Sequence, residues 1–134
     1  MKFNPFACLV LMVGLFVAGC GGGNDNSGPV GCSANIENGI TVRVVDAVTN
    51  ANIATGATGT IQDGSYTETL QPTAFDGAGN VLYMTGAPER TGTYTIRINK
   101  TGYAPFVLQN VTVTKNVCHV NVVNVIAPLQ PVIP

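Results

Sequence analysis

The stretch Tyr94-Thr95-Ile96-Arg97-Ile98-Asn99 alternates large apolar residues with polar ones at every step. Side chains of an extended strand point to opposite faces in turn, so a period of two places the apolar ones together on one face. Ile40-Thr41-Val42-Arg43-Val44 repeats the pattern earlier in the chain. Both stretches are typical of half-buried antiparallel strands, with one face in a core and the other in water.

The rest of the chain favours further strands over helices, because Val, Ile and Thr are frequent and good helix formers are scarce. We expect additional strands at about 57–62, 65–70, 81–85, 105–114 and 117–126. Asp63-Gly64 indicates a hairpin turn, and a switch in apolar phase predicts a bulge near Gln109-Asn110. The fold class is therefore all-β, as a single Greek-key β-sandwich of about seven strands.

Composition narrows the range of functions before any motif is considered. The chain has 134 residues, a length that suits one domain, with 6 Lys and Arg against 7 Asp and Glu. A net charge of −1 gives no electrostatic footprint for nucleic acid, so we expect no nucleic-acid partner. Hydrophobic residues make up 46% of the chain, which argues against disorder throughout.

The N-terminal residues have the character of a targeting segment. Lys2 precedes an uncharged apolar run from Phe6 to Ala18, which is shorter than the roughly 20 residues a membrane-spanning helix needs. The run ends in Val17-Ala18-Gly19-Cys20, and a polar Gly- and Asn-rich segment follows. A hydrophobic residue, two small residues and an immediate Cys resemble the lipobox of bacterial lipoproteins.

The lipobox resemblance implies that Cys20 carries a diacylglycerol and becomes the N-terminus after cleavage. Residues 1–19 would then be a cleaved signal helix, and residues 20–31 a lipidated flexible tether. The implied location is the bacterial cell envelope, with Gly21 after the Cys favouring the outer membrane. Two alternatives are an ordinary signal peptide with a coincidental Cys and an uncleaved N-terminal anchor.

Two cysteines remain after this processing, because Cys8 lies in the removed segment and Cys20 is lipidated. Cys32 and Cys118 would reach an oxidising compartment, where an even pair is most simply a disulfide. The alternative is a reactive Cys118 thiol beside His119. Neighbouring residues of a strand point to opposite faces, however, so these two would make a poor nucleophile and base.

A second resemblance covers roughly residues 38–127. Gly92 to Tyr103 has a Gly, an aromatic residue, an alternating strand, a Lys and a Gly-Tyr turn, and Ile40 to Asn50 ends in an Asp-x-x-Thr-Asn turn. These features resemble the carboxypeptidase regulatory-like domains, which implies a transthyretin-like (prealbumin-like) sandwich over 32–127. The run after Asn50 departs from the family pattern, so the resemblance does not predict the structure of the first loop.

In this reading, Gly92 and Gly102 serve turns, while Tyr94 and Tyr103 pack and tie corners to backbone. The prolines at 128, 131 and 134 argue against a continuing central strand, so we expect residues 128–134 to form an extended tail.

The sequence offers little for catalysis or metal binding, so we expect no enzyme, no metal site and no cofactor besides the lipid on Cys20. His119 is the only histidine, and a zinc site needs three or four ligands, so we expect an outward polar side chain on the last strand. Asp76 to Asn80 fits a hairpin loop better than a calcium loop. Whether Glu68 and Glu89 meet across the sheet stays open.

The function predicted from these features is that of a membrane-anchored envelope lipoprotein with a non-catalytic binding or structural module. Candidate surfaces are the loops around 50–57, 71–80 and 86–92, and the expected partner is an envelope protein or a glycan. One alternative is a subunit of an envelope or secretion assembly. Another is a glycan-binding module, in which Tyr66, Tyr83 and Phe75 stack on sugars.

Overall fold

The computed structural model describes residues 30–133, so the predicted signal peptide, Cys20 and tether residues 20–29 lie outside the described part. Eight strands and no helix form within it. The strands are β1 (Asn38–Asp46), β2 (Thr58–Asp63), β3 (Tyr66–Thr69), β4 (Gln71–Phe75), β5 (Val81–Pro88), β6 (Gly92–Asn99), β7 (Phe106–Val113) and β8 (Val123–Leu129).

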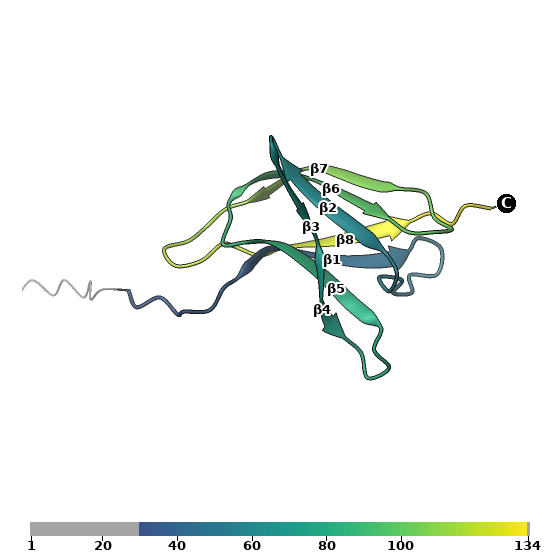
Figure 1. Ribbon diagram of the computed structural model, residues 1–134, viewed down its shortest axis with the longest axis horizontal. Helices are drawn as coiled ribbons and strands as arrows, with labels where there is room; N and C mark the ends of the chain where they lie inside the picture. The colour runs from purple at the N-terminus through teal and green to yellow at the C-terminus, as the bar shows by residue number, and fades with distance from the viewer. Residues whose placement is uncertain (1–29, 134) are drawn as a thin grey trace, which may run out of the picture.

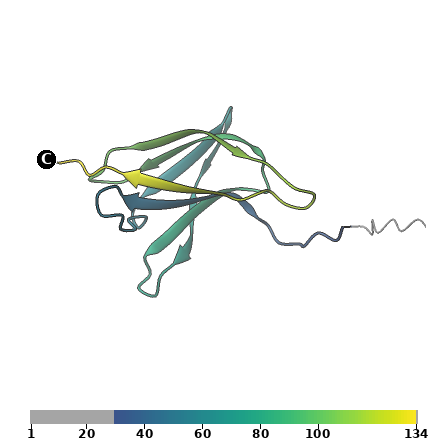
Figure 2. The same ribbon diagram turned by 180° about the vertical axis from the view of Figure 1, so that it is seen from behind.

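The strands form two four-stranded sheets that face each other (Figures 1 and 2). One sheet, called sheet A below, has the order β4-β5-β1-β8, and the other, sheet B, has the order β3-β2-β6-β7. Hairpins β2–β3, β4–β5 and β6–β7 each stay within one sheet, and the chain crosses between sheets after each of them. The prediction of an all-β sandwich is confirmed, with eight strands in place of about seven.

Strand β1 lies inside sheet A and joins distant parts of the chain. It pairs antiparallel with β5, where Ile40 lies opposite Gly86, and parallel with β8, where Val42 lies opposite Val125. The last strand is thus placed beside the first, which is a long-range pairing. Apolar burial on the inner face of β1 fixes this register, because a slip by one residue would turn that face outward.

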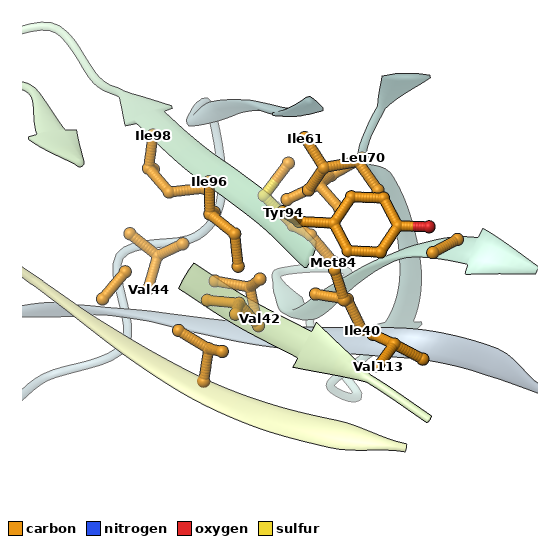
Figure 3. Close-up of a cluster of buried hydrophobic side chains, with 14 of the residues drawn as sticks. Ile40, Val42, Val44, Ile61, Leu70, Met84, Tyr94, Ile96, Ile98 and Val113 are labelled. Atoms are coloured by element: carbon orange, nitrogen blue, oxygen red, sulfur yellow. The ribbon is translucent and has the colours of Figure 1, made fainter. Parts of the chain in front are cut away.

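The core lies between the sheets and consists of apolar side chains from both (Figure 3). Its buried members include Ile40, Val42, Val44, Ile61, Leu70, Met84, Tyr94, Ile96, Ile98, Val111, Val113, Val125, Ala127 and Leu129. Leu70 sits where the chain crosses from β3 to β4. A Cβ on Gly59 or on Gly86 would come within 2.7–2.8 Å of the Leu70 side chain, so both positions need glycine for this close approach.

Two local predictions from the sequence are confirmed. Asp63 pairs with Tyr66 around a two-residue hairpin turn, and Gly64 has a φ of 58°, as the first position of a type II′ turn requires. In β7 an extra residue bulges at Gln109-Asn110, since Tyr94 pairs with Val111 but Ile96 pairs with Leu108. Asn110 takes up the bulge with a φ of 60°.

The structure corrects two other predictions. Residues 71–75, expected as part of a loop, form strand β4, which tolerates Pro72 because it is an edge strand with an irregular register. The strand expected over 117–126 is displaced, because the structure has a loop up to Val122 and then strand β8.

Strand β8 also extends beyond residue 127, where the sequence placed the end of the sandwich. Pro128 pairs with Val45 in register, and Leu129 is fully buried in the core. Proline fits here because β8 is an edge strand of sheet A, with no further strand to receive an N–H donor. The extended tail therefore begins after Leu129.

We predict that Leu129→Ala lowers the free energy of unfolding by about 2–5 kcal/mol, the usual cost of a buried Leu-to-Ala cavity. The measurement is urea unfolding followed by circular dichroism. Val132→Ala is the matched control, since Val132 is 59% exposed and the change should cost less than about 0.5 kcal/mol. Equal effects from the two substitutions would contradict the assignment of Leu129 to the core.

Candidate functional site

The functional candidates gather at the two ends of the sandwich. The N-terminal segment and the loop between β7 and β8 lie at one end, while the C-terminus and the loops after β1 and β6 lie at the other (Figure 1). We call the first end, with Cys32, Ser33, Glu89, Cys118 and His119, the cystine end. Cys20, the predicted lipidation site, lies outside the described residues, and residues 30–133 include no helix able to span a membrane.

The cystine end contains the predicted disulfide between Cys32 and Cys118, whose Cα atoms are 5.2 Å apart. Local hydrogen bonds shape the loop that carries Cys118. The Asn116 side-chain oxygen accepts the N–H groups of Cys118 at 2.8 Å and of His119 at 3.0 Å. Both sulfurs are consumed in the bond, so Cys118 provides no free thiol for the alternative chemistry with His119.

His119 lies in this loop and not on the last strand, which corrects the sequence prediction. Its Nε2 is 3.0 Å from the Ser33 hydroxyl oxygen, and its Nδ1 is 2.7 Å from Oε1 of Glu89. The imidazole is 20% exposed and is held on both sides. The contact with Glu89 is an ion pair when the ring is protonated and a hydrogen bond otherwise. Ser33, His119 and Glu89 thus form a three-residue cluster that the sequence analysis missed.

Glu89 is fixed from its other side by backbone. Its Oε1 accepts the Glu37 N–H at 2.9 Å, and its own N–H donates to the Glu37 carbonyl at 2.9 Å. The backbone of Glu89 adopts a φ of 50° to allow this. The hydrogen bond from the Glu37 N–H, followed by the one from His119, lowers the pKa of the Glu89 carboxyl.

The order serine, imidazole and carboxylate is that of a nucleophile relay, in which the base would take the hydroxyl proton. Acyl transfer additionally requires a hollow for the substrate beside the serine. The cavities at Ala54–Met84, Gly56–Tyr103, Thr41–Ile126 and Asn52–Leu82, of about 210–310 Å³ each, are lined by other residues. The contacts of this cluster join the N-terminal segment to the β7–β8 loop and to the β5–β6 connection, so we call it a clasp.

A second polar cluster lies along the β5–β6 connection. The Arg90 guanidinium donates to Asp63 and to the Tyr94 hydroxyl, and its Cζ lies 3.9 Å from the centre of the Tyr66 ring. The Tyr94 hydroxyl in turn donates to the Arg90 carbonyl at 3.2 Å, which is the predicted tie from ring to backbone. In this cluster the Arg90 guanidinium lies over the ring of Tyr66, which is one of the three predicted sugar-stacking residues.

Glu68 and Glu89 have different partners in the structure. The Tyr66 hydroxyl donates to Glu68, and this hydrogen bond raises the pKa of Tyr66 to about 12. Glu68 also accepts the Ala87 N–H at 3.0 Å, whereas Glu89 contacts Glu37 and His119. The two carboxylates therefore support separate contacts in the structure.

At the opposite end, the loop after β1 and the β4–β5 hairpin lie together. The Asn52 amide donates to the Leu82 carbonyl at 2.9 Å, and Thr55 accepts the Val81 N–H at 2.8 Å. A cavity of about 250 Å³ lies between the two segments. Of the three predicted surface loops, 50–57 and the tip of 71–80 meet here, while 86–92 lies at the cystine end.

The hairpin tip at 76–80 is held by its own aspartate. One oxygen of Asp76 accepts the N–H groups of Ala78 and Asn80 at 2.9 and 2.8 Å, and the other accepts from the Asn80 side chain. These bonds, led by the one from the Asn80 side chain, lower the pKa of Asp76. The segment is thus the hairpin loop expected from the sequence.

Tyr103 ties a further corner at this end. Its hydroxyl donates to Oδ2 of Asp46 at 2.9 Å, so it bonds a side chain rather than the backbone expected from the sequence. The other Asp46 oxygen accepts the N–H groups of Val48 and Thr49. These hydrogen bonds, led by the Thr49 N–H, lower the pKa of Asp46.

We predict that reduction of the Cys32–Cys118 bond lowers the free energy of unfolding by up to about 4–5 kcal/mol. The chain-entropy cost of releasing an 86-residue loop gives this magnitude. The measurement is urea unfolding with and without a phosphine reductant. The double variant Cys32→Ser/Cys118→Ser should unfold at the lower urea concentration in both conditions. An unchanged midpoint on reduction of the natural chain would contradict the prediction.

We also predict that Glu89 makes the domain sensitive to acid. Its pKa is lower in the folded chain than the ordinary value of 4.5, so its stabilisation is complete above about pH 4.5. That stabilisation is lost as the pH falls through the folded-state pKa. Glu89→Gln should therefore flatten the decline of the unfolding midpoint between pH 5 and pH 2.5, by the linkage between proton binding and folding.

Glu37→Gln is the control for Glu89→Gln, because Glu37 contributes its backbone and not its side chain to the contact. It should keep the natural pH profile. A profile that is equally flat in both variants, or unchanged in both, would show that the Glu89 carboxylate is not the group responsible.

Comparison with protein-family models finds no match for this chain, and comparison with the curated proteins finds none. The resemblances to bacterial lipoproteins and to carboxypeptidase regulatory-like domains accordingly rest on the residues quoted for them.

Proposed function

We propose that the protein is a lipid-anchored bacterial envelope protein whose β-sandwich acts as a non-catalytic binding or structural module. The observation that carries the proposal is Val17-Ala18-Gly19-Cys20 after a short apolar run and before a Gly- and Asn-rich segment. The Cys32–Cys118 disulfide supports it independently, since such bonds persist in exported proteins. An outer-membrane location is part of the proposal.

The position of the tether sets the orientation of the module in this proposal. Residues 21–29 lie between the proposed lipidated Cys20 and the first described residue, Val30, and random-coil scaling gives a tether of this length a reach of roughly 15–18 Å. The first described residues, from Val30 onward, lie at the cystine end (Figure 2). This end would then face the membrane, while the loops after β1 and β6 would face away from it.

The polar clusters favour binding or architecture over catalysis. Ser33, His119 and Glu89 are engaged with one another, and Arg90 is engaged with Asp63 and Tyr94. Such contacts stabilise a fold without requiring a substrate. A subunit of an envelope assembly is the second form of the same proposal, in which the loops facing away from the membrane would meet another protein.

We predict that Cys20→Ser blocks lipidation and processing. The natural protein, expressed in a Gram-negative host with a radiolabelled fatty acid, should incorporate label and fractionate with outer membranes. Cys20→Ser should lose the label and keep residues 1–19, because the thiol is the acyl acceptor. Cleavage by mass spectrometry and fractionation by density gradient are the two readouts.

Cys8→Ser is the matched control, since it changes another cysteine within the apolar run. It should be labelled and processed like the natural chain. Labelling that persists in Cys20→Ser would overturn the proposed anchor, as would membrane fractionation without any fatty-acid label.

A further inference from the structure

The outer face of sheet A carries a shallow hollow that no contact described above uses. Alternation along β1 directs Ile40, Val42 and Val44 into the core, so Thr41 and Arg43 lie on the outer face. The parallel register with β8 places Asn124 beside Thr41 and Ile126 beside Arg43. Tyr83 of β5 completes the lining on the other side of β1. The hollow has a volume of about 210 Å³.

Among the residues that the structure describes, Arg43 in this hollow has no acidic partner. The two ion pairs among residues 30–133 are Arg90 with Asp63 and His119 with Glu89, and no acidic residue lines the hollow. Arg43 is half-buried in the sheet face, between neighbours that are apolar or neutral. A guanidinium presents several N–H donors in a planar fork that suits a carboxylate. The electrostatic complement of this hollow is therefore an anion.

The remaining lining adds a flat apolar surface and directional polar groups. Tyr83 is 41% exposed and Ile126 is 59% exposed, so both present apolar area to solvent. Thr41 supplies a hydroxyl and Asn124 an amide, each with donor and acceptor atoms. A ring face with a cation, an amide and a hydroxyl around it matches a sugar ring that carries a carboxylate.

The size of the hollow also fits a sugar unit. It is smaller than the roughly 300–1,000 Å³ of pockets that enclose drug-sized ligands, and it lies on a strand surface rather than between domains. One or two units of a chain could rest there while the rest of the chain continues across the sheet. The ladder of β1 with β5 and β8 holds the lining residues in place, so binding orders little backbone.

We propose that the outer face of sheet A binds acidic polysaccharide, with the uronic-acid carboxylate on Arg43 and the sugar ring against Tyr83. This inference rests on the proposed binding function and names its ligand class and its residues. The inference also assigns different roles to two of the predicted sugar-stacking residues. Tyr83 belongs to the site, whereas Tyr66 is covered by the Arg90 guanidinium.

The experiment uses the full-length lipidated protein in detergent micelles and measures its retardation in native gels that contain polygalacturonate. The natural chain should be retarded, and dextran at the same concentration should have no effect. Arg43→Ala and Tyr83→Ala should each weaken the affinity at least tenfold. Raising the salt concentration should weaken binding by the natural chain and have little effect on Arg43→Ala.

Arg97→Ala is the matched control, because Arg97 is an exposed arginine of β6 on sheet B, outside the lining of the hollow. It removes the same charge and should keep the natural affinity. Urea midpoints within error of the natural chain would show that all three variants fold. Phe75→Ala tests an exposed aromatic residue outside the hollow and should also bind normally.

Three results would overturn the inference. They are the absence of retardation by polygalacturonate, an equal loss of affinity in Arg97→Ala, and equal retardation by polyglutamate, which would show general attraction to acidic polymers. Each of these can occur while Cys20 is lipidated and the protein fractionates with membranes. Failure of this inference is therefore distinguishable from failure of the proposed anchor.

Discussion

The alternation of β1 is the constraint on which the rest of the structure depends. Ile40, Val42 and Val44 on its inner face are fully buried, and the two neighbours of β1 in sheet A take their register from it. Figure 3 shows these three side chains meeting the inner face of sheet B. The same alternation directs Thr41 and Arg43 outward, so the core and the proposed saccharide surface are the two faces of one strand.

The sequence predicts those parts of the fold in which local pattern and tertiary burial agree. Clean alternation located β1 and β6, and Asp63-Gly64 located the hairpin between β2 and β3. Prediction from the local pattern failed where the position of a strand in the sheet overrides the residue's own propensity for strand. Pro72 and Pro128 argue against strands by propensity, yet both residues lie on edge strands, where a missing donor costs nothing. Whether a strand lies at the edge of a sheet depends on the order of all the strands, so a short stretch of sequence does not reveal it.

The cystine end shows a different limit. His119 lies 30 residues from Glu89 and 86 from Ser33, so no spacing rule relates the three. One signal was present, because Ser33 follows Cys32 and His119 follows Cys118. A disulfide brings the neighbours of both cysteines close together, so pairing 32 with 118 also places 33 near 119. The position of Glu89, by contrast, depends on the φ of 50° in the β5–β6 connection, which the sequence does not reveal.

Stabilising contacts and the proposed binding surface lie on different parts of the domain. Three covalent or polar ties hold the cystine end and the neighbouring β5–β6 connection, namely the disulfide, the His119 clasp and the Arg90 cluster. If the tether enters at that end, the strands run away from the membrane and the outer face of sheet A stands sideways to it. A long polysaccharide lying parallel to the membrane could cross this face without meeting the bilayer. The ladders of β1 with β5 and β8 already hold this face in place, so a ligand that binds there orders little backbone, whereas recognition by a loop carries the cost of ordering the loop.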